Sequence, residues 1–353
     1  MSKQNIQAAL GPSCGATLPS NRFISVVICT YGRATAFEDL LNSLDMQTYE
    51  NFEVLVIDGN GKVSPARDTV EKFLNRSAAR MQVALIASEK GLTRQRNVGL
   101  QAAKGDLICF LDDDVTFDAD FLADVAGLFE RPEMQTVGGI TPYDVLHYPT
   151  PVTLRWRLRW LFDVMPSLNP GEADHLGRAV PLSFLKPWSG RKEIGWLPGF
   201  CMIYRRAAVE DLRFDELLPT YAGEDRDFSM RVGRCWRLLI CGDLRVKHHY
   251  SIQGRDSDLE RLRQSSFGVG RRFAKYARGL RDYPTIFSTF VGDLLIDLMG
   301  LVGRPGRHSF LTLFVRIRAF FVGLRSARAP ELTARSSRGS DPLRQQGTAS
   351  STE

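Results

Sequence analysis

The sequence lacks several patterns that would assign the chain to common functional classes. None of its six cysteines forms a C-x-x-C pair, which argues against a structural zinc site. There is no Gly-x-x-x-x-Gly-Lys loop for ATP, and no Ser-His-Asp or Cys-His arrangement competes for a nucleophilic role. Cys29 and Cys109 lie inside apolar strand patterns, where free thiols pack as small hydrophobic groups. We therefore expect a reducing compartment.

The first 22 residues lack the basic start and long apolar stretch of a signal peptide. They are rich in Ser, Gly, Gln and Pro, so we expect a flexible N-terminal segment and a protein that stays in the cytoplasm. The 353 residues, of which 44% are hydrophobic and 24% charged, have an ordinary globular balance. The chain is long enough for one large domain or two small ones.

Positive charge is concentrated near the C-terminus. Residues 251–325 hold thirteen Arg and Lys against six Asp and Glu, whereas the net charge of the whole chain is only +6. A basic region can contact phosphate, nucleic acid or an anionic membrane, although most charged faces are simply solvated. The remaining residues, 326–353, are polar enough to predict a disordered tail.

Short apolar strands alternate with helical stretches over the first half of the chain. Strands are predicted at 25–29, 52–57, 81–86 and 106–111, and helices at 34–46, 65–74, 94–103 and 121–129. This alternation indicates an α/β fold with a wound, mainly parallel sheet. The carboxyl ends of its strands then share one edge, which is where ligands bind in such sheets.

The second half is less regular. Strands are predicted at 196–204, 237–241 and 244–247, with a helix from about residue 224. Residues 155–160 alternate like a strand but place two Trp residues at helical spacing, so both readings stay open. A basic helix at 258–280 precedes two amphipathic stretches at 283–302 and 309–325.

Three consecutive aspartates, Asp112, Asp113 and Asp114, end the apolar strand at 107–111. Like charges beside a buried strand repel one another and lose hydration, so a cation is expected there. A divalent metal carrying a phosphate group fits this position, because such ions bind one or two carboxylates and complete their shell with substrate oxygens. A solvated acidic turn is the alternative.

Five motifs occur in an order that resembles a family 2 glycosyltransferase of the GT-A fold. They are VVICTYGR at 26–33, VLVIDG at 54–59, GLTRQRNVG at 91–99, FLDDD at 110–114 and GEDRD at 223–227. The resemblance covers about residues 23–250. It implies an inverting enzyme that transfers a sugar from a nucleoside diphosphate donor with a divalent metal, Mn²⁺ or Mg²⁺.

The donor site is predicted at the strand ends. Thr30 and Asp58 can accept hydrogen bonds from a nucleobase or ribose, and Tyr31 belongs to the same motif. Asp58 has an alternative role as a turn residue. Arg33 and Arg96 can pair with phosphate oxygens, although each could be an ordinary surface arginine.

The resemblance implies further donor and metal contacts. Its D-x-D pattern assigns Asp112 and Asp114 to the nucleotide sugar and its metal, with Asp113 between them and Asp114 as the principal metal ligand. Relatives often place a metal-binding histidine near His248, and His249 is the alternative. Residues 196–202, beginning with Trp196, would line the floor near the donor sugar.

Glu224 and Asp225 supply carboxylates for general-base catalysis, which removes the proton from an attacking hydroxyl. As acids in the first turn of a helix they could also only stabilise its N-terminus. The resemblance implies that Asp225 is the base and that Glu224 binds the acceptor or supports the base.

Residues 251–325 are predicted to associate with a membrane, because Arg residues are interleaved with Phe-rich amphipathic stretches. Asp293 and Asp297 make a spanning helix less favourable than surface docking. The acceptor is then a glycan or a lipid-linked molecule at the cytoplasmic face, and the donor is UDP-, GDP- or dTDP-linked. Packing on the catalytic domain (residues 23–250) or in a homodimer is the alternative role of these helices.

Two other functions compete with this interpretation. A sugar nucleotidyltransferase shares the fold but carries a Gly-rich, basic loop after the first strand, where this chain has Thr30-Tyr31-Gly32-Arg33. A basic nucleic-acid-binding or membrane-binding protein without catalysis is the other alternative. The sequence has no aromatic-stacking strand motif or recognition helix, so no nucleic-acid partner is expected.

Overall fold

The structure is a computed structural model that describes residues 21–32, 35–60, 64–76, 81–250, 256–303 and 306–326. Nearly all of the predicted flexible segment at 1–22, Arg33 and nearly all of the predicted tail lie outside the described residues.

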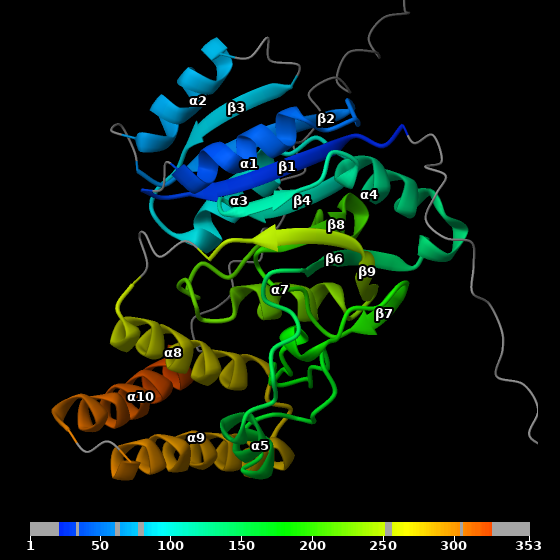
Figure 1. Ribbon diagram of the computed structural model, residues 1–353. Helices are drawn as coiled ribbons and strands as arrows, with labels where there is room; N and C mark the ends of the chain where they lie inside the picture. Colours follow the sequence, from blue (N-terminus) through cyan, green and yellow to red (C-terminus); the bar gives the residue numbers. More distant parts are fainter. Residues whose placement is uncertain are drawn as a thin grey trace, which may run out of the picture.

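The described chain contains a nine-stranded mixed sheet with helices around it (Figure 1). The strands are β1 (Ile24–Thr30), β2 (Phe52–Asp58), β3 (Gln82–Ala87), β4 (Leu107–Asp112), β5 (Val115–Phe117), β6 (Val137–Asp144), β7 (Arg191–Ile194), β8 (Cys201–Arg205) and β9 (Arg237–His248). The α-helices are α1 (Thr35–Asp45), α2 (Pro65–Arg76), α3 (Leu92–Ala102), α4 (Phe121–Glu130), α5 (Leu154–Leu161), α6 (Arg206–Val209), α7 (Glu224–Val232), α8 (Asp258–Tyr276), α9 (Tyr283–Gly303) and α10 (Arg307–Ser326).

The first half forms the wound parallel sheet that its sequence pattern predicts. β2 pairs in parallel with β3 and β1, and β1 pairs in parallel with β4. Every residue of β2 is buried, as expected for a strand covered by helices on both faces. Successive side chains of β1 enter two different cores: Val26 and Ile28 pack with α1, whereas Val27 packs with Leu100 of α3.

The second half adds antiparallel pairs. β8 lies antiparallel between β4 and β6, and β9 runs parallel to β6. The prediction of a strand over 196–204 was wrong at its start, because β8 begins only at Cys201. The two strands predicted at 237–241 and 244–247 are one strand, β9. A register shift against β6 between Pro142 and Tyr143 accommodates the residues expected to break it.

Residues 154–161 are helical, which settles the ambiguity of the alternating Arg-Trp segment. No side chain of α5 is buried, and Leu154 and Leu161 are among the most exposed apolar residues. The strand-like alternation of this segment therefore did not reflect a buried sheet face.

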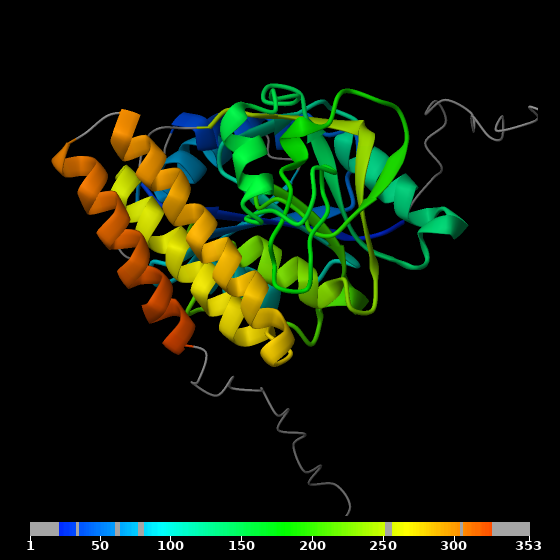
Figure 2. The ribbon, with the colours of Figure 1, turned by 90° about the horizontal axis from the view of Figure 1, so that it is seen from below.

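Helices α8, α9 and α10 form a layer beside the sheet domain and lie side by side (Figure 2). The backbones of α8 and α10 come unusually close at two glycines. A Cβ on Gly270 would lie 2.1 Å from the carbonyl oxygen of Phe320, and one on Gly323 would lie 2.1 Å from that of Phe267. Larger side chains would push the two helices apart.

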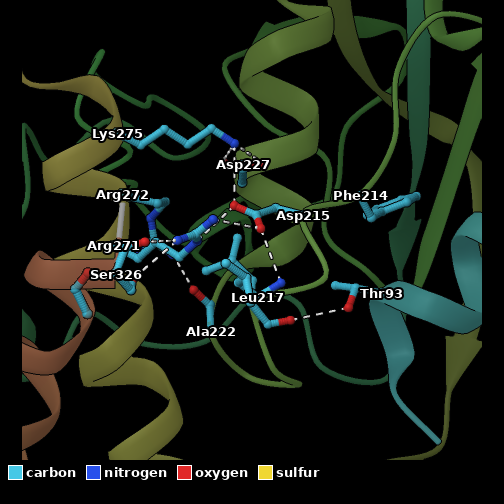
Figure 3. Close-up of polar contacts among 12 residues, drawn as sticks. Thr93, Phe214, Asp215, Leu217, Ala222, Asp227, Arg271, Arg272, Lys275 and Ser326 are labelled. Carbon is cyan, nitrogen blue, oxygen red and sulfur yellow. Dashed lines mark hydrogen bonds and ion pairs between the residues drawn. The ribbon is translucent and has the colours of Figure 1, made fainter. Parts of the chain in front are cut away.

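Ion pairs join α8 to α7 and to the loop before it (Figure 3). Arg271 donates to both carboxylate oxygens of Asp215 at 2.8 and 2.9 Å. Lys275 lies 3.2 Å from Asp227 of α7, and the hydroxyl of Tyr276 donates to Asp227 at 2.6 Å. The C-terminal helices therefore contact the segment that carries Glu224 and Asp225.

Candidate active site

The carboxyl ends of β1, β2 and β4 meet at one edge of the sheet. Thr30 at the end of β1 is paired with Asp58 at the end of β2, and Cys29 is paired with Asp112 at the end of β4. The structure thus brings together the strand ends from which the donor-binding residues were predicted.

Asp112, Asp114 and His248 form a group suited to a divalent cation. Their ligand atoms all lie within 4.8 Å of one another. His248 reaches the triplet because the end of β9 pairs with β5, which places it opposite Val115. Two carboxylates and an imidazole are donors that Mn²⁺ accepts, so these residues fit the predicted metal.

His248 rather than His249 lies beside the aspartates. Its Nε2 is 3.1 Å from Asp114 Oδ1, whereas His249 contacts the hydroxyl of Thr116 at 2.8 Å. His248 is the last residue of β9, and the side chain of His249, the next residue, contacts Thr116 of β5 and not the aspartates. Burial alone lowers the pKa of His248, but the hydrogen bond to Asp114 and the charges of Asp112, Asp114 and Asp144 outweigh it and raise the pKa.

The middle aspartate points elsewhere. Asp113 is buried and accepts a hydrogen bond of 2.8 Å from the hydroxyl of Thr30. This contact holds the end of β1 against the loop after β4. Asp112 and Asp114 lie in the cation group, while Asp113 links that loop to the strand of Thr30.

Asp58 is buried and uses one oxygen in a turn. Its Oδ1 accepts from the backbone and side-chain nitrogens of Asn60 at 2.9 and 2.7 Å. These contacts are the ones expected if Asp58 stabilises a turn. Its role in nucleotide binding stays a prediction.

Tyr31 and Trp196, two further predicted donor contacts, differ in their exposure to solvent. Tyr31 is 41% exposed, with the ammonium of Lys90 4.3 Å from its ring centre. Trp196 is partly buried, and its Nε1 donates to the carbonyl of Val180 at 3.3 Å. Their predicted donor contacts remain predictions.

The acid pair begins helix α7. Glu224 is buried, whereas Asp225 is partly exposed and accepts hydrogen bonds from the backbone nitrogens of Gly199 at 3.1 Å and Arg226 at 2.8 Å. Burial and the charge of Asp225 raise the pKa of Glu224 to about 7, although Arg96 opposes this shift. The two carboxylates therefore differ in solvent access: only Asp225 is open to an acceptor.

Arg96 connects the acid pair to the cation group. Its guanidinium lies 3.1 Å from Glu224 and 3.5 Å from Asp112, and it donates to the carbonyl of Gly199 at 3.0 Å. Burial lowers its pKa, but the charges of Glu224 and Asp112 outweigh burial and raise it, so Arg96 stays charged. It is 2% exposed, and its predicted phosphate contact stays a prediction.

The sequence analysis did not single out two residues that organise this edge. Gln95 donates to the carbonyls of Thr30 and Ile57, both at 2.9 Å, and so joins the ends of β1 and β2. Its place in the 91–99 motif was a usable signal. Asp144 is fully buried at the end of β6 and contacts His147 at 3.0 Å. No spacing in the sequence marked it.

A cavity of about 550 Å³ lies away from these residues. It is lined by the loop of Asp174 and His175, the C-terminal end of α7 and the start of β9. None of the predicted site residues lines it. The candidate site is instead the strand edge itself, where acidic residues converge.

Comparison with known proteins identifies the family. The profile of glycosyl transferase family 2 matches residues 25–213, which is more than half of the chain. The chain belongs to glycosyl transferase family 2. This match supports a glycosyltransferase and not the nucleotidyltransferase or non-catalytic alternatives.

Curated relatives match parts of the chain. An amylovoran biosynthesis glycosyltransferase, AmsB of Erwinia amylovora, is 34% identical over 113 residues, which is 31% of this chain and 37% of that protein. A pre-mycofactocin glycosyltransferase of Mycobacterium tuberculosis is 27% identical over 227 residues, covering 64% of this chain and 40% of that protein. The chain therefore spans well under half the length of these relatives.

Solved structures share the fold. A mannosyltransferase from Pyrobaculum calidifontis, in complex with GDP-Man and Mn²⁺, matches with a TM-score of 0.52 at 15% identity, covering 88% of this chain and 89% of that one. GalNAc-T7 with UDP, GalNAc and Mn²⁺ matches with a TM-score of 0.54 at 16% identity, covering 86% of this chain and 56% of that one. These likenesses confirm the predicted GT-A fold.

Proposed function

We propose that the chain is an inverting, metal-dependent glycosyltransferase that moves a sugar from a nucleoside diphosphate donor to an acceptor hydroxyl. One observation carries the proposal. The cation group of Asp112, Asp114 and His248 and the acid pair of Glu224 and Asp225 face one site and are linked through Arg96. A single displacement, in which the acceptor oxygen attacks the donor sugar, inverts the configuration at the anomeric carbon.

Asp112, Asp114 and His248 would hold the metal, with Mn²⁺ or Mg²⁺ as candidates. When bound, the metal would offset negative charge on the departing diphosphate. Thr30, Asp58 and Tyr31 bind the nucleoside, and Arg96 keeps its positive charge beside the phosphates and orients Glu224 and Asp112.

Asp225 is the general base. The backbone nitrogens of Gly199 and Arg226 fix both of its oxygens, so its orientation is set before an acceptor arrives. It takes the proton of the acceptor hydroxyl as the oxygen attacks the anomeric carbon. Glu224 is buried and supports this arrangement through Arg96.

The chain divides into a catalytic domain at 23–250 and a membrane-associating region at 251–325. Apolar side chains stand exposed on α9 and α10, namely Tyr283, Phe287, Leu298, Val302, Phe310, Phe314 and Phe321. Arg318 and Arg325 are exposed on α10, and Arg281 is exposed directly before α9. Apolar burial and attraction of Arg to anionic lipid reinforce each other at a bilayer surface.

Docking on the cytoplasmic face fits this surface better than spanning. Among the described residues, the stretch Leu280–Val302 is long and apolar enough to cross a membrane, with a mean hydropathy of 1.7 and 22% of it buried. Yet Asp293 pairs with Arg159 at 3.0 Å, and Asp297 pairs with Arg316 of α10. One face of α9 is thus packed against protein. The acceptor would then be lipid-linked.

The donor and metal assignments are tested together. UDP-, GDP- and dTDP-linked sugars are incubated with the full chain and Mn²⁺, and released sugar and nucleotide are measured by mass spectrometry. Asp114→Ala should abolish turnover with an unchanged circular dichroism spectrum, while Asp118→Ala, an exposed acid beyond β5, should not. Full activity in the presence of a chelator contradicts the metal assignment.

Membrane docking is tested by flotation with anionic vesicles. The full chain should float, and less so in high salt, because the attraction is partly electrostatic. A Phe287→Asp/Phe314→Asp double variant should stay in solution. Met46→Asp, which changes a similarly exposed apolar residue directly after α1, should still float. A wild-type chain that stays in solution as a dimer would assign the surface to a second copy.

A further inference from the structure

Two arginines beside the acid pair lack the carboxylate partners that their neighbours have. On α8, Arg271 and Lys275 reach Asp215 and Asp227, while Arg272 points to the carbonyl of Ala222 (Figure 3). Among the residues that the structure describes, neither Arg272 nor Arg226 of α7 has a carboxylate within 4.0 Å. Asp227 is a nearby negative charge, but it already forms ion pairs with Arg231 and Lys275.

Arg272 is buried deeply for an unpaired cation. It is 2% exposed, and its Nε has no hydrogen-bond partner in the described part of the chain. Burial and the charge of Arg226 lower the pKa of Arg272 to about 9. A buried guanidinium without a counterion is costly, and removing it from water is normally offset by an ion pair.

The two guanidinium groups are neighbours on the side of Gly223 where a Cβ atom would lie. A Cβ on this residue would lie 2.5 Å from Arg272 Nη1 and 2.8 Å from Arg226 Nη2. Gly223 has a φ of 78°, so its left-handed conformation and lack of a side chain both permit this arrangement. Like charges this close repel each other unless an anion lies between them or beside them.

Arg226 connects this pair to the site. It follows Asp225 directly, is partly exposed, and places its guanidinium carbon 6.0 Å from the centre of the Trp196 ring. The pair therefore lies on the α7 and α8 side of Asp225, where it adjoins the helices with the exposed apolar surface. The cation group lies at the strand ends and is linked to Glu224 through Arg96.

We propose that Arg226 and Arg272 bind a phosphate group carried by the acceptor. This inference rests on the proposed function and adds a substrate class to it: a lipid-linked acceptor with a phosphate or diphosphate near its reacting hydroxyl. The planar guanidinium forks suit phosphate oxygens. The phosphate supplies the missing counterion and places the hydroxyl beside Asp225.

The test compares farnesyl phosphate, farnesol and inorganic phosphate as probes. Binding to the full chain with Mn²⁺ is followed by tryptophan fluorescence, since Trp196 lies next to Arg226. Wild-type protein should bind farnesyl phosphate more tightly than farnesol. Arg226→Gln should weaken farnesyl phosphate binding about 10- to 100-fold and leave farnesol binding unchanged, because one charged hydrogen-bonding group is lost.

Controls separate this site from general charge and from folding. Arg263→Gln removes a charge from the exposed face of the same helix, α8, and should change no affinity. Arg226→Lys keeps the charge but loses the planar fork, so it should give an intermediate affinity. Because Arg272→Gln removes a buried contact to Ala222, it is interpreted only alongside circular dichroism.

Several outcomes overturn the inference. Equal binding of farnesol and farnesyl phosphate would do so, as would an unchanged preference in Arg226→Gln. If inorganic phosphate binds at Arg226 and farnesyl phosphate does not displace it, the pair holds free phosphate and not an acceptor. Donor hydrolysis is measured in the same samples. Its absence from wild-type protein counts against the proposed function, whereas normal hydrolysis without phosphate preference counts against the Arg226–Arg272 site alone.

Discussion

Tyr276→Phe removes a single hydroxyl that joins the C-terminal helices to the helix of the acid pair. This hydroxyl donates to Asp227 Oδ1 at 2.6 Å, and the Asp227 side chain is fully buried. A hydrogen bond to a charged group contributes about 1.5 to 3 kcal/mol. Arg231 at 2.9 Å and Lys275 at 3.2 Å still neutralise the carboxylate, so we expect a loss of about 2 kcal/mol in the free energy of unfolding.

Urea denaturation followed by circular dichroism measures this loss. With a slope of about 3 kcal/mol per molar urea, the midpoint should fall by about 0.7 M. Tyr283→Phe is the matched control, because Tyr283 is 58% exposed at the start of α9 and should change stability by less than about 0.5 kcal/mol. Equal midpoints for the two variants would refute the reasoning that Asp227 depends on α8.

The pH dependence gives a second check on the same carboxylate. Burial raises the pKa of Asp227, but Arg231, Lys275 and the Tyr276 hydroxyl outweigh it and lower the pKa below its ordinary value of 3.8. The unfolded chain therefore binds a proton at a higher pH than the folded one. The stabilisation is fully present above about pH 4 and is lost as the pH falls through the lower folded pKa. The stability difference between wild type and Asp227→Asn should shrink in that acidic range and stay constant from pH 5 to 7.

Three further predictions concern the chemistry and the packing. Asp225→Asn should keep nucleotide affinity but lower turnover by about 10² to 10⁴, as expected for loss of a general base, and near wild-type turnover would move that role elsewhere. Glu224→Gln should lower turnover less than Asp225→Asn, because Glu224 is buried and acts on the site only through Arg96; steady-state kinetics of both variants in parallel decide the order. Gly323→Leu should destabilise the protein by about 1 to 3 kcal/mol in thermal unfolding, since its Cβ would lie 2.1 Å from the Phe267 carbonyl oxygen, whereas Gly300→Leu on α9 meets no atom within 4 Å and should be neutral.

The parallel half of the sheet could be predicted from sequence because its signals are local. The four expected strands at 25–29, 52–57, 81–86 and 106–111 differ from β1 to β4 by at most one residue at either end. Buried parallel strands are continuous apolar runs, and each is followed by a helix of different period. The family resemblance could also be recognised from local sequence, since several of its motifs lie where these strands end.

The second half was harder because its elements depend on distant partners. β8 begins at Cys201 and not at Trp196, since its register is set by pairing with β4 and β6, more than sixty residues away in the chain. β9 continues past Gly242 because β7 and β5 pair with its two ends. The sequence of a short segment such as 155–160 does not indicate whether a partner strand is present. The spacing of its apolar residues fits a helix and a strand equally well.

The candidate site divides along the same line. Three adjacent charges at a strand end predicted a cation site at Asp112 and Asp114, and these two residues lie in one group with His248. The contribution of His248 and the buried bridge of Arg96 depend on pairings that the local sequence does not contain.

Arg226 and Arg272 show most clearly what cannot be predicted from the local sequence. They are separated by 46 positions in the sequence, each is an ordinary helical arginine in its own segment, and only the packing of α8 against α7 makes them neighbours. A charge count assigns Arg272 to the basic region at 251–325. Its burial beside Gly223 makes it part of the surroundings of Asp225, so helix α8 of the C-terminal region and the acid pair share one set of interactions.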